Sequence, residues 1–280
     1  MHKTIGVVFD FDDTLAPDST SSFLEAHGLN VKRFWRSVDP LLDEGWDPVP
    51  AYLFRLLEAS NAGAVPPITR HDLERHGRQL SSYPGVSRIF SRLRKHAHSV
   101  NPSVAVEFYL ISSGIGEILR ATPVAKQFKD IWACEFQYDE TGAIVFPKNI
   151  VSFTDKTRFL FHILKGITGP ASRSRPFDVN KKIPADQVRI PMKHMVFIGD
   201  GYTDVPCFAL IKKSGGTAIG VYDRKQREKW GRAWGFTEEG RVSNLVPADF
   251  TSRSALSDSL MMAVESIARR IALENQTYQG

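Results

Sequence analysis

Short apolar runs of strand length alternate along this chain with stretches of helical spacing. The first run, IGVVF at 5–9, is rich in β-branched residues and stops at Asp10, which is typical of a strand buried on both faces of a parallel sheet. Similar runs recur at 104–111, 195–198 and 217–221. Strands that alternate with helices predict an α/β fold with a Rossmann-like, doubly wound parallel sheet.

Each of the three strongest runs ends on a polar residue: Asp10, Ser112 and Asp200. In open α/β sheets, ligands bind in the crevice beyond the carboxyl ends of the strands. The three polar groups therefore predict one shared functional site at that edge of the sheet. The chain has no GxGxxG or Walker A motif, which disfavours dinucleotide and P-loop chemistry.

Two segments interrupt the alternation. Residues 17–83 hold no convincing strand but many apolar positions at helical spacing, and YPG at 83–85 indicates a return to the core. We expect these residues to form a small helical cap inserted after the first strand, with 1–16 and 84–280 as the α/β core. Residues 168–191, rich in Pro, Ser, Arg and Lys, predict a mobile surface loop within the core.

Composition and charge narrow the class of protein. With 280 residues, 42% hydrophobic and 24% charged, the chain falls in the ordinary globular range, which excludes intrinsic disorder and collagen-like repeats. No run approaches the ~18 apolar residues that span a bilayer, and the N-terminal segment lacks the long apolar region of a signal peptide. The two cysteines, Cys134 and Cys207, are too few for a disulfide framework or a zinc site. These features predict a cytoplasmic protein with no membrane partner.

The net charge of +5 is mildly basic and lacks the clustered excess of a dedicated nucleic-acid binder. It suits an anionic small substrate equally well. A basic run at 224–232 is interpreted as a solvated helix face. The oligomeric state does not follow from these features.

The sharpest chemical signal is DFDDTL at 10–15, directly after the first strand. Because side chains alternate along an extended chain, Asp10 and Asp12 lie on the same side, so two carboxylates converge at one strand end. A hard cation or a shared proton relieves such a pair, and Mg²⁺ commonly takes one or two carboxylates plus a substrate phosphate. For this motif alone, a turn whose acidic residues cap the next helix is an equally good interpretation.

A second motif, Ser112-Ser113-Gly114, follows the run at 104–111. A hydroxyl and free backbone N–H groups at a strand-to-helix turn form an anion cradle, and the glycine lets the backbone approach a ligand. Taken alone, a serine that only caps the next helix fits as well.

Lys156 stands at the start of a predicted helix whose apolar residues include Phe159 and Ile163. A lysine at a helix N-terminus opposes the helix dipole, so its placement there calls for an anionic partner. Without context, a solvated lysine or one paired with Asp155 is the simpler interpretation.

The last motif is GDGYTD at 199–204, after the run at 195–198. Its glycines allow a tight turn, and Asp200 and Asp204 can both face the crevice. The alternative is an ordinary glycine-rich turn in which Asp204 caps the next helix.

Together the motifs stand in the order carboxylate pair, hydroxyl, lysine, carboxylate pair. In this order they resemble the motifs of the haloacid dehalogenase (HAD) superfamily of Mg²⁺-dependent phosphohydrolases, and the implied core covers most of the chain. The resemblance implies that residues 17–83 are a cap of the type called C1. The helical cap and the SSG motif are similar to those of the phosphoserine phosphatase-like branch.

The resemblance also implies roles for single residues. Asp10 matches the nucleophile that takes the phosphoryl group as an aspartyl phosphate, and Asp12 matches the general acid/base, whose backbone carbonyl also ligates Mg²⁺. The implied phosphate-binding residues are Ser112, Ser113, Gly114 and Lys156. The implied metal ligands are Asp10, Asp12, Asp200 and Asp204. Asp204 either binds the metal directly or contacts the residues that bind it.

The expected function is hydrolysis of a small phosphomonoester, a phosphorylated metabolite, with Mg²⁺ as cofactor and an aspartyl-phosphate intermediate. The resemblance favours a phosphatase over a dehalogenase, because the dehalogenases of the superfamily lack a carboxylate where this chain has Asp12. A phosphatase for nucleotide or nucleic-acid ends is an alternative that only the mild basicity and the loop at 168–191 support. A regulatory protein that binds a phosphate ligand without turnover is a further alternative.

The chain departs from the phosphoserine enzymes at Ser19, where they carry a glutamate that reads the substrate's amino group. Phosphoserine is therefore not the expected substrate, although Glu25 or Asp18 could replace that glutamate. Arg55 lies near the position of the arginine that binds the substrate's carboxylate in those enzymes. We interpret Arg55 as a surface residue.

Overall fold

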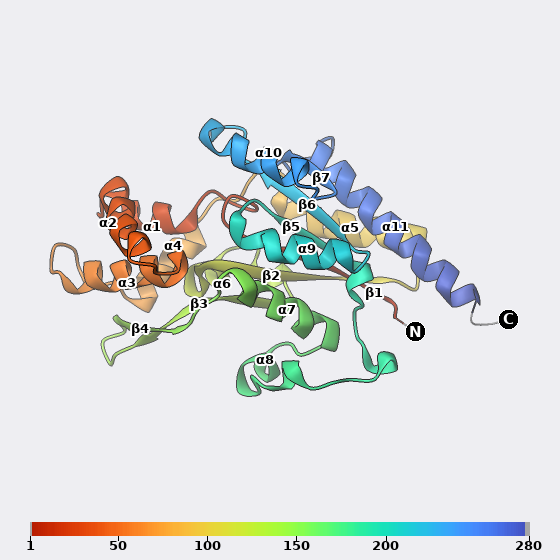
Figure 1. The fold of residues 1–280 in the computed structure, drawn as a ribbon, viewed down its shortest axis with the longest axis horizontal. Coiled ribbons are helices and arrows are strands. Elements are labelled where there is room, and N and C mark those ends of the chain that lie inside the picture. The colour runs from red at the N-terminus through yellow and green to blue at the C-terminus, as the bar shows by residue number, and fades with distance from the viewer. Residues whose placement is uncertain (1, 278–280) are drawn as a thin grey trace.

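A seven-stranded sheet forms the centre of the molecule (Figure 1). The computed structural model describes residues 2–277. The strands are β1 (Thr4–Phe9), β2 (Ala105–Ile115), β3 (Asp130–Tyr138), β4 (Ile144–Asn149), β5 (Met195–Gly199), β6 (Thr217–Tyr222) and β7 (Asn244–Pro247). They lie in the order β4-β3-β2-β1-β5-β6-β7, and only the pair β3–β4 is antiparallel. The predicted α/β fold with a largely parallel sheet is confirmed.

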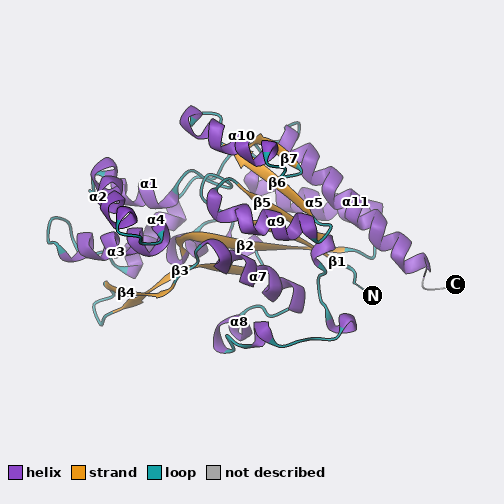
Figure 2. Cartoon of the chain, in the orientation of Figure 1, coloured by secondary structure: helices purple, strands orange, loops and turns teal. Residues whose placement is uncertain are grey.

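Helices cover both faces of this sheet (Figure 2). They are α1 (Ser19–Ala26), α2 (Val31–Asp43), α3 (Pro48–Asn61), α4 (Arg70–Gln79), α5 (Val86–Val100), α6 (Gly116–Ala121), α7 (Phe153–Lys165), α8 (Pro170–Ser174), α9 (Val205–Lys213), α10 (Trp230–Glu238) and α11 (Ala255–Thr277). Helix α5 packs against α11, and α7 packs against α9. Val7 and Phe9 of β1 share a core with α5 and α11, whereas Val8 shares one with α7 and α9. Burial of β1 on both sides explains its unbroken apolar sequence.

Among the described residues, no helix combines the length and the apolar character that crossing a membrane requires.

Helices α1–α4 follow β1 and gather at one end of the molecule, whereas both chain termini lie toward the other end (Figure 1). Each begins at a side chain that accepts a hydrogen bond from the first turn: Asp18, Asn30, Asp47 and Thr69. Helix α1 contacts α2 and α4, and α2 contacts α3. These helices, called the cap helices below, occupy the stretch expected to form a cap. The domain limits at 17–83 stay a prediction.

A hairpin of β3 and β4, which the sequence pattern does not predict, extends the sheet beside the cap helices. The N–H of Arg70 donates to the carbonyl of Gly142, and the N–H of Ile144 donates to the carbonyl of Ile68, each at 2.9 Å. Strand β4 also contacts α3. The hairpin therefore ties the cap helices to the sheet through backbone hydrogen bonds.

Residues 168–191 contain helix α8 and short 3-10 turns at Asp178–Asn180 and Ala185–Gln187. The ammonium of Lys165, at the end of α7, donates to the carbonyl of Val179 at 2.6 Å. The segment therefore has local structure, and its predicted mobility stays a prediction.

His194, just before β5, gives the fold a pH dependence that can be measured. Its side chain is fully buried, and burial lowers its pKa from 6.5 to about 4 although Glu274 opposes the shift. The unfolded chain binds the proton more readily between those pH values, so acidification from pH 6.5 toward 4 favours unfolding. We expect His194 to contribute up to about 1.4 kcal/mol per pH unit to the slope of unfolding free energy in that range.

Urea denaturation of wild type and His194→Leu at a series of pH values from 4 to 7 checks this expectation. The variant should lose stability less steeply on acidification than the wild type. Parallel curves for the two proteins would contradict the assignment.

Candidate active site

A cavity of about 410 Å³ lies between the carboxyl ends of the central strands and the cap helices. Residues of all four sequence motifs line it: Asp10, Asp12, Ser112, Ser113, Gly114, Lys156 and Asp200. The remaining predicted site residue, Asp204, is fully buried and contacts Lys156. The fold therefore brings the eight predicted residues into one neighbourhood, and their roles stay predictions.

Lys156 connects two of the motifs. Its ammonium donates to Asp10 Oδ1 at 2.9 Å and to Asp204 Oδ1 at 2.7 Å. The lysine is fully buried at the start of α7, where Ser152 and Asp155 form a capping box. Its anionic partners are thus Asp10 and Asp204, not the adjacent Asp155, which lies 3.9 Å from Arg158. Burial lowers the pKa of this ammonium, but the two carboxylates outweigh it and raise the pKa overall.

Asp10, Asp200 and Asp204 each place a carboxylate oxygen within 4.8 Å of the others. One ammonium cannot balance three carboxylates, so the cluster keeps a negative charge that a cation would neutralise. Oxygen donors of this kind fit a hard divalent cation such as Mg²⁺. The carboxylate of Asp12 is not part of this cluster. It accepts a hydrogen bond from the N–H of Ser19 at 2.7 Å, where α1 begins.

Both carboxyls of the first motif are harder to ionise than an exposed aspartate. Burial raises the pKa of Asp10 to about 7, against the opposing effect of Lys156. Burial, with the nearby negative charge of Asp18, raises the pKa of Asp12 to about 8, and the Ser19 N–H opposes this shift. A carboxyl with such a pKa can hold and release a proton near neutral pH, as a general acid must.

The SSG motif lies inside the last part of β2, where the pairing with β3 is irregular between Ile111 and Ile115. The sequence predicts a turn after the strand for this motif, whereas the strand continues to Ile115 and α6 begins at Gly116. The Ser112 hydroxyl accepts the N–H of Gly114 at 3.0 Å. That hydroxyl keeps its own proton available to donate into the cavity.

Gly114 is needed because a Cβ there would lie 2.6 Å from Asp12 Oδ2 and 3.2 Å from Ser112 Oγ. We expect Gly114→Ala to displace the Asp12 carboxyl and reduce kcat for any reaction of this site by about 100-fold. A suitable control is Gly231→Ala, since a Cβ at Gly231 meets nothing within 4 Å. Equal activity of the two variants would show that the contact with Asp12 has no consequence.

Several residues of the cavity wall were not found by sequence reasoning. One is Tyr52 on α3, whose hydroxyl donates to the Ser113 carbonyl at 2.7 Å. Next to the wall residues Pro48 and Phe153, the Ser152 hydroxyl donates to Asp47 Oδ2 at 2.6 Å, and both bonds join the cap helices to the core. The further walls are Thr20, Trp35, Pro48, Phe153, Tyr202 and Thr203. In the sequence these residues look like ordinary core or loop positions.

Lys229 does not fit the interpretation of the basic run at 224–232 as a solvated helix face. It lines the cavity and forms an ion pair with Asp13. Asp13 is buried, has a φ of 55°, and also accepts a hydrogen bond from Gln226 at 2.7 Å. A left-handed aspartate costs free energy, so these two contacts fix a backbone shape that the sequence alone does not indicate.

Three residues were considered in the sequence as contacts for a substrate's amino or carboxylate group, and of these only Asp18 lines the cavity. Arg55 donates to the Ser37 carbonyl at 2.7 Å and pairs with Glu58, and it is not among the cavity walls. Glu25 is exposed. Asp18 lines the cavity while it caps α1.

Comparison of the sequence with known proteins identifies a relative but no family. No family model matches the chain. An "uncharacterized protein" of Borreliella burgdorferi is 25% identical over 283 residues, which cover 92% of this chain and 95% of that protein.

Solved structures match over most of the chain. A phospho-aspartyl intermediate analogue of phosphoserine phosphatase aligns with a TM-score of 0.55 and 14% identity over 92% of this chain and 98% of that one. A probable phosphoserine phosphatase from Vibrio cholerae aligns with a TM-score of 0.55 and 12% identity, over 96% of this chain and 67% of that one. A HAD family hydrolase from Salmonella enterica serovar Typhi aligns with a TM-score of 0.53 and 15% identity over 81% of this chain. This chain spans 65% of that protein's length. The chain therefore has the fold of the HAD hydrolases, with phosphoserine phosphatases among its structural matches.

Proposed function

We propose that this protein is a Mg²⁺-dependent phosphatase that hydrolyses a small phosphomonoester through an aspartyl phosphate on Asp10. The observation that carries the proposal is the buried contact of Lys156 with Asp10 and Asp204 beside the Asp200 carboxylate. An ammonium and a carboxylate cluster at the ends of parallel strands suit phosphoryl transfer, which needs positioning and neutralisation of spreading negative charge.

In this proposal the carboxylates of Asp10 and Asp200 and the backbone carbonyl of Asp12 would hold the metal ion. When bound, the ion neutralises negative charge on the phosphoryl oxygens. Asp204 bonds both Lys156 and the N–H of Gly201, the latter at 3.1 Å. We assign it to holding that lysine and the turn around Asp200.

The first step forms a bond between an Asp10 oxygen and phosphorus and breaks the bond from phosphorus to the leaving oxygen. Asp12, protonated because its pKa is about 8, gives its proton to that oxygen, so the leaving group departs as an alcohol. The Ser112 hydroxyl, the N–H groups of Ser113 and Gly114 and the Lys156 ammonium bind the phosphoryl oxygens.

The second step uses Asp12 as a base. Its carboxylate takes a proton from a water molecule while the water oxygen bonds to phosphorus. The bond between phosphorus and Asp10 breaks, which releases inorganic phosphate and restores both carboxyls to their starting states. Splitting the hydrolysis in this way replaces one difficult step by two easier ones.

The cavity walls indicate the kind of leaving group. Trp35, Tyr52, Phe153 and Tyr202 supply aromatic surface, Asp18 supplies negative charge, and none of the described lining residues is an arginine. Such walls suit a small, partly apolar phosphomonoester better than a substrate with a second strongly anionic group. A phosphorylated metabolite is accordingly proposed over a nucleic-acid end.

Phosphate release from a panel of phosphorylated metabolites and of oligonucleotides with terminal phosphates, with Mg²⁺ or with EDTA, tests the proposed function. Metal-dependent release is the expected result. If only oligonucleotide ends are hydrolysed, the nucleic-acid alternative holds. If folded protein binds phosphate but releases none from any substrate, the protein is a ligand-binding regulator.

Arg55→Met is expected to leave kcat/KM on the best substrate within about twofold of wild type. The reason is that the Arg55 guanidinium bonds Ser37 and Glu58 and does not line the cavity. The same steady-state assay checks it. A large rise in KM confined to substrates that carry a carboxylate would contradict this placement.

A further inference from the structure

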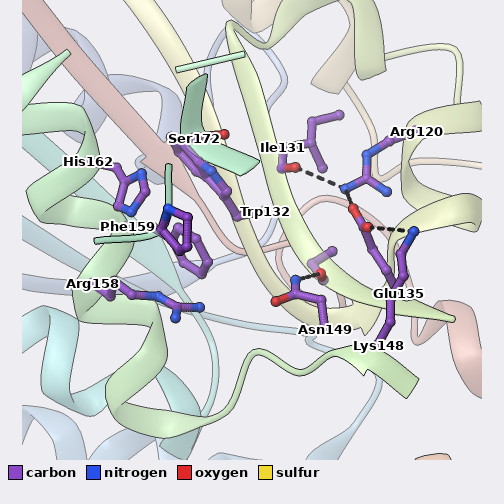
Figure 3. A pocket seen from close by; sticks show the side chains of 12 residues that line it. Arg120, Ile131, Trp132, Glu135, Lys148, Asn149, Arg158, Phe159, His162 and Ser172 are labelled. Atoms are coloured by element: carbon purple, nitrogen blue, oxygen red, sulfur yellow. Dashed lines mark hydrogen bonds and ion pairs between the residues drawn. The ribbon is translucent and has the colours of Figure 1, made fainter. Parts of the chain in front are cut away.

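A second cavity, of about 360 Å³, lies beside β3 and α7. It shares none of its described lining residues with the cavity around Asp10 and Lys156, called the catalytic cavity below. Figure 3 shows its two sides. Trp132, Arg158, Phe159 and His162 form one side, and Arg120, Glu135, Lys148 and Asn149 form the other. Its volume is within the range of small-ligand sites.

Three polar atoms of this cavity's side chains are buried without a hydrogen-bond partner: Trp132 Nε1, Arg158 Nε and His162 Nδ1. Trp132 is 4% exposed and His162 2% exposed. A buried polar group left unpaired costs about 1–3 kcal/mol. Their concentration around one cavity indicates that an occupant supplies the partners.

The groups around Trp132 do not offer its Nε1 a partner. The rings of Tyr109 and Phe159 stack on Trp132, with ring centroids 6.0 and 5.2 Å away. Only the edge of the indole, which carries Nε1, remains for a polar contact. The nearby carbonyls of Ile131 and Ala133 already accept hydrogen bonds from Arg120 at 3.3 Å and from Asn149 at 2.8 Å.

The cavity offers more donors than acceptors. Arg120, Lys148 and Arg158 supply three cationic groups, and among the described lining residues Glu135 is the one acid. Both Glu135 oxygens are already engaged, one by Arg120 and the other by Lys148 at 3.5 Å. Two of the unpaired atoms, Trp132 Nε1 and Arg158 Nε, can only donate. An occupant that satisfies them must therefore accept hydrogen bonds. The three cationic groups outnumber Glu135 and the nearby Asp155, 3.9 Å from Arg158, and this excess favours an occupant that carries negative charge.

We infer that this cavity is a second ligand site, which binds a small organic anion. A carboxylate or phosphoryl group of the ligand accepts from Trp132 Nε1, Arg158 and Lys148. A short apolar body packs against Phe159, Ile131 and Pro176, which also line the cavity. The inference does not depend on the proposed phosphatase activity, because its residues and its readout are separate from the catalytic cavity.

The indole N–H signals of the full-length, ¹⁵N-labelled protein test this site directly. The chain has five tryptophans, and the signal lost in Trp132→Phe identifies that of Trp132. Benzoate and phenylphosphonate are the two anionic probes, one for each headgroup chemistry, and benzamide is their neutral analogue. Trp35, whose Nε1 already donates to Ser21 at 2.8 Å in the catalytic cavity wall, reports binding at the other cavity.

We expect at least one anion to shift the Trp132 signal saturably at concentrations up to about 20 mM, which detects millimolar dissociation constants. Benzamide should not. The doubly substituted Arg158→Met, Lys148→Met protein should bind the probe about tenfold more weakly, since charge-assisted hydrogen bonds are lost. Lys32→Met, at an exposed position on α2, should bind it like wild type.

Three results would overturn the site. The first is a Trp132 signal that neither anion moves at that concentration. The second is an equal shift with benzamide, and the third is undiminished binding in the doubly substituted protein. A shift of the Trp35 signal without one of Trp132 would place the anion in the catalytic cavity instead.

Discussion

Asp10→Asn is expected to abolish phosphate release, lowering kcat by about 10⁴-fold or more, because an amide oxygen cannot form and release the aspartyl phosphate. The fold should survive. The pKa of the Asp10 carboxyl is raised to about 7, mainly by burial. In the unfolded chain this pKa is 3.8. Because the folded value is the higher one, the Asp10 carboxyl lowers the free energy of unfolding progressively as the pH rises from 3.8 to about 7. The neutral asparagine removes this effect, so the metal-free variant should not melt below wild type at pH 8.

The two readouts separate chemistry from stability. Steady-state phosphate release and thermal melting are measured on the same preparations, with Asp39→Asn, an exposed aspartate of α2, as the matched control. The control should keep wild-type activity. Residual turnover above about 1% in Asp10→Asn would show that another group attacks the phosphorus. Loss of activity together with a collapsed melting temperature would leave Asp10 a structural role only.

The parts of the fold that the sequence predicts are those in which local pattern and tertiary environment agree. Strand β1 carries no polar side chain from Ile5 to Phe9 because both its faces are buried, so its sequence shows the unbroken run that is typical of such a strand. Strand β4 is the contrary case. It is an edge strand in which Val145 is 46% and Phe146 64% exposed, and its sequence carries neither the alternation nor the unbroken run by which strands are found. Its place is fixed by pairing with β3 and by the hydrogen bond from Ile144 to Ile68, which lies between α3 and α4, far away in sequence.

The candidate site follows the same division. Asp10, Ser112 and Asp200 were predictable because parallel strands bring their carboxyl ends to one edge, so a local motif implies a shared location. Tyr52 and Lys229 reach the same cavity from α3 and from the turn before α10. Nothing in their own sequence neighbourhoods says so, because their positions depend on how the helices close over the sheet.

Lys156→Met should produce the largest combined loss of stability and activity. The ammonium is fully buried between Asp10 and Asp204, so its removal leaves carboxylates buried without their counter-ion. Breaking a buried ion pair in this way costs about 3–5 kcal/mol. Loss of a cation that binds the transferred phosphoryl group should also lower kcat by about 10³-fold.

The pH dependence of the Lys156→Met deficit distinguishes charge from packing. Methionine fills nearly the same volume as the lysine stem, so a packing defect would cost the same at every pH. A charge defect is relieved when the carboxyls take up protons, which Asp10, with a pKa near 7 even beside the lysine, does readily. Urea denaturation at pH 8 and at pH 5 should therefore show a smaller deficit at the lower pH.

A second substitution and a control variant complete the test. Adding Asp204→Asn to Lys156→Met should restore part of the stability at pH 8 but none of the activity. The control is Arg158→Met on the same helix, where the side chain is 40% exposed, and it should cost below about 1 kcal/mol. A deficit independent of pH, or one that the second substitution deepens, would mean that Lys156 supports the fold by its packing and not as the counter-ion of this carboxylate cluster.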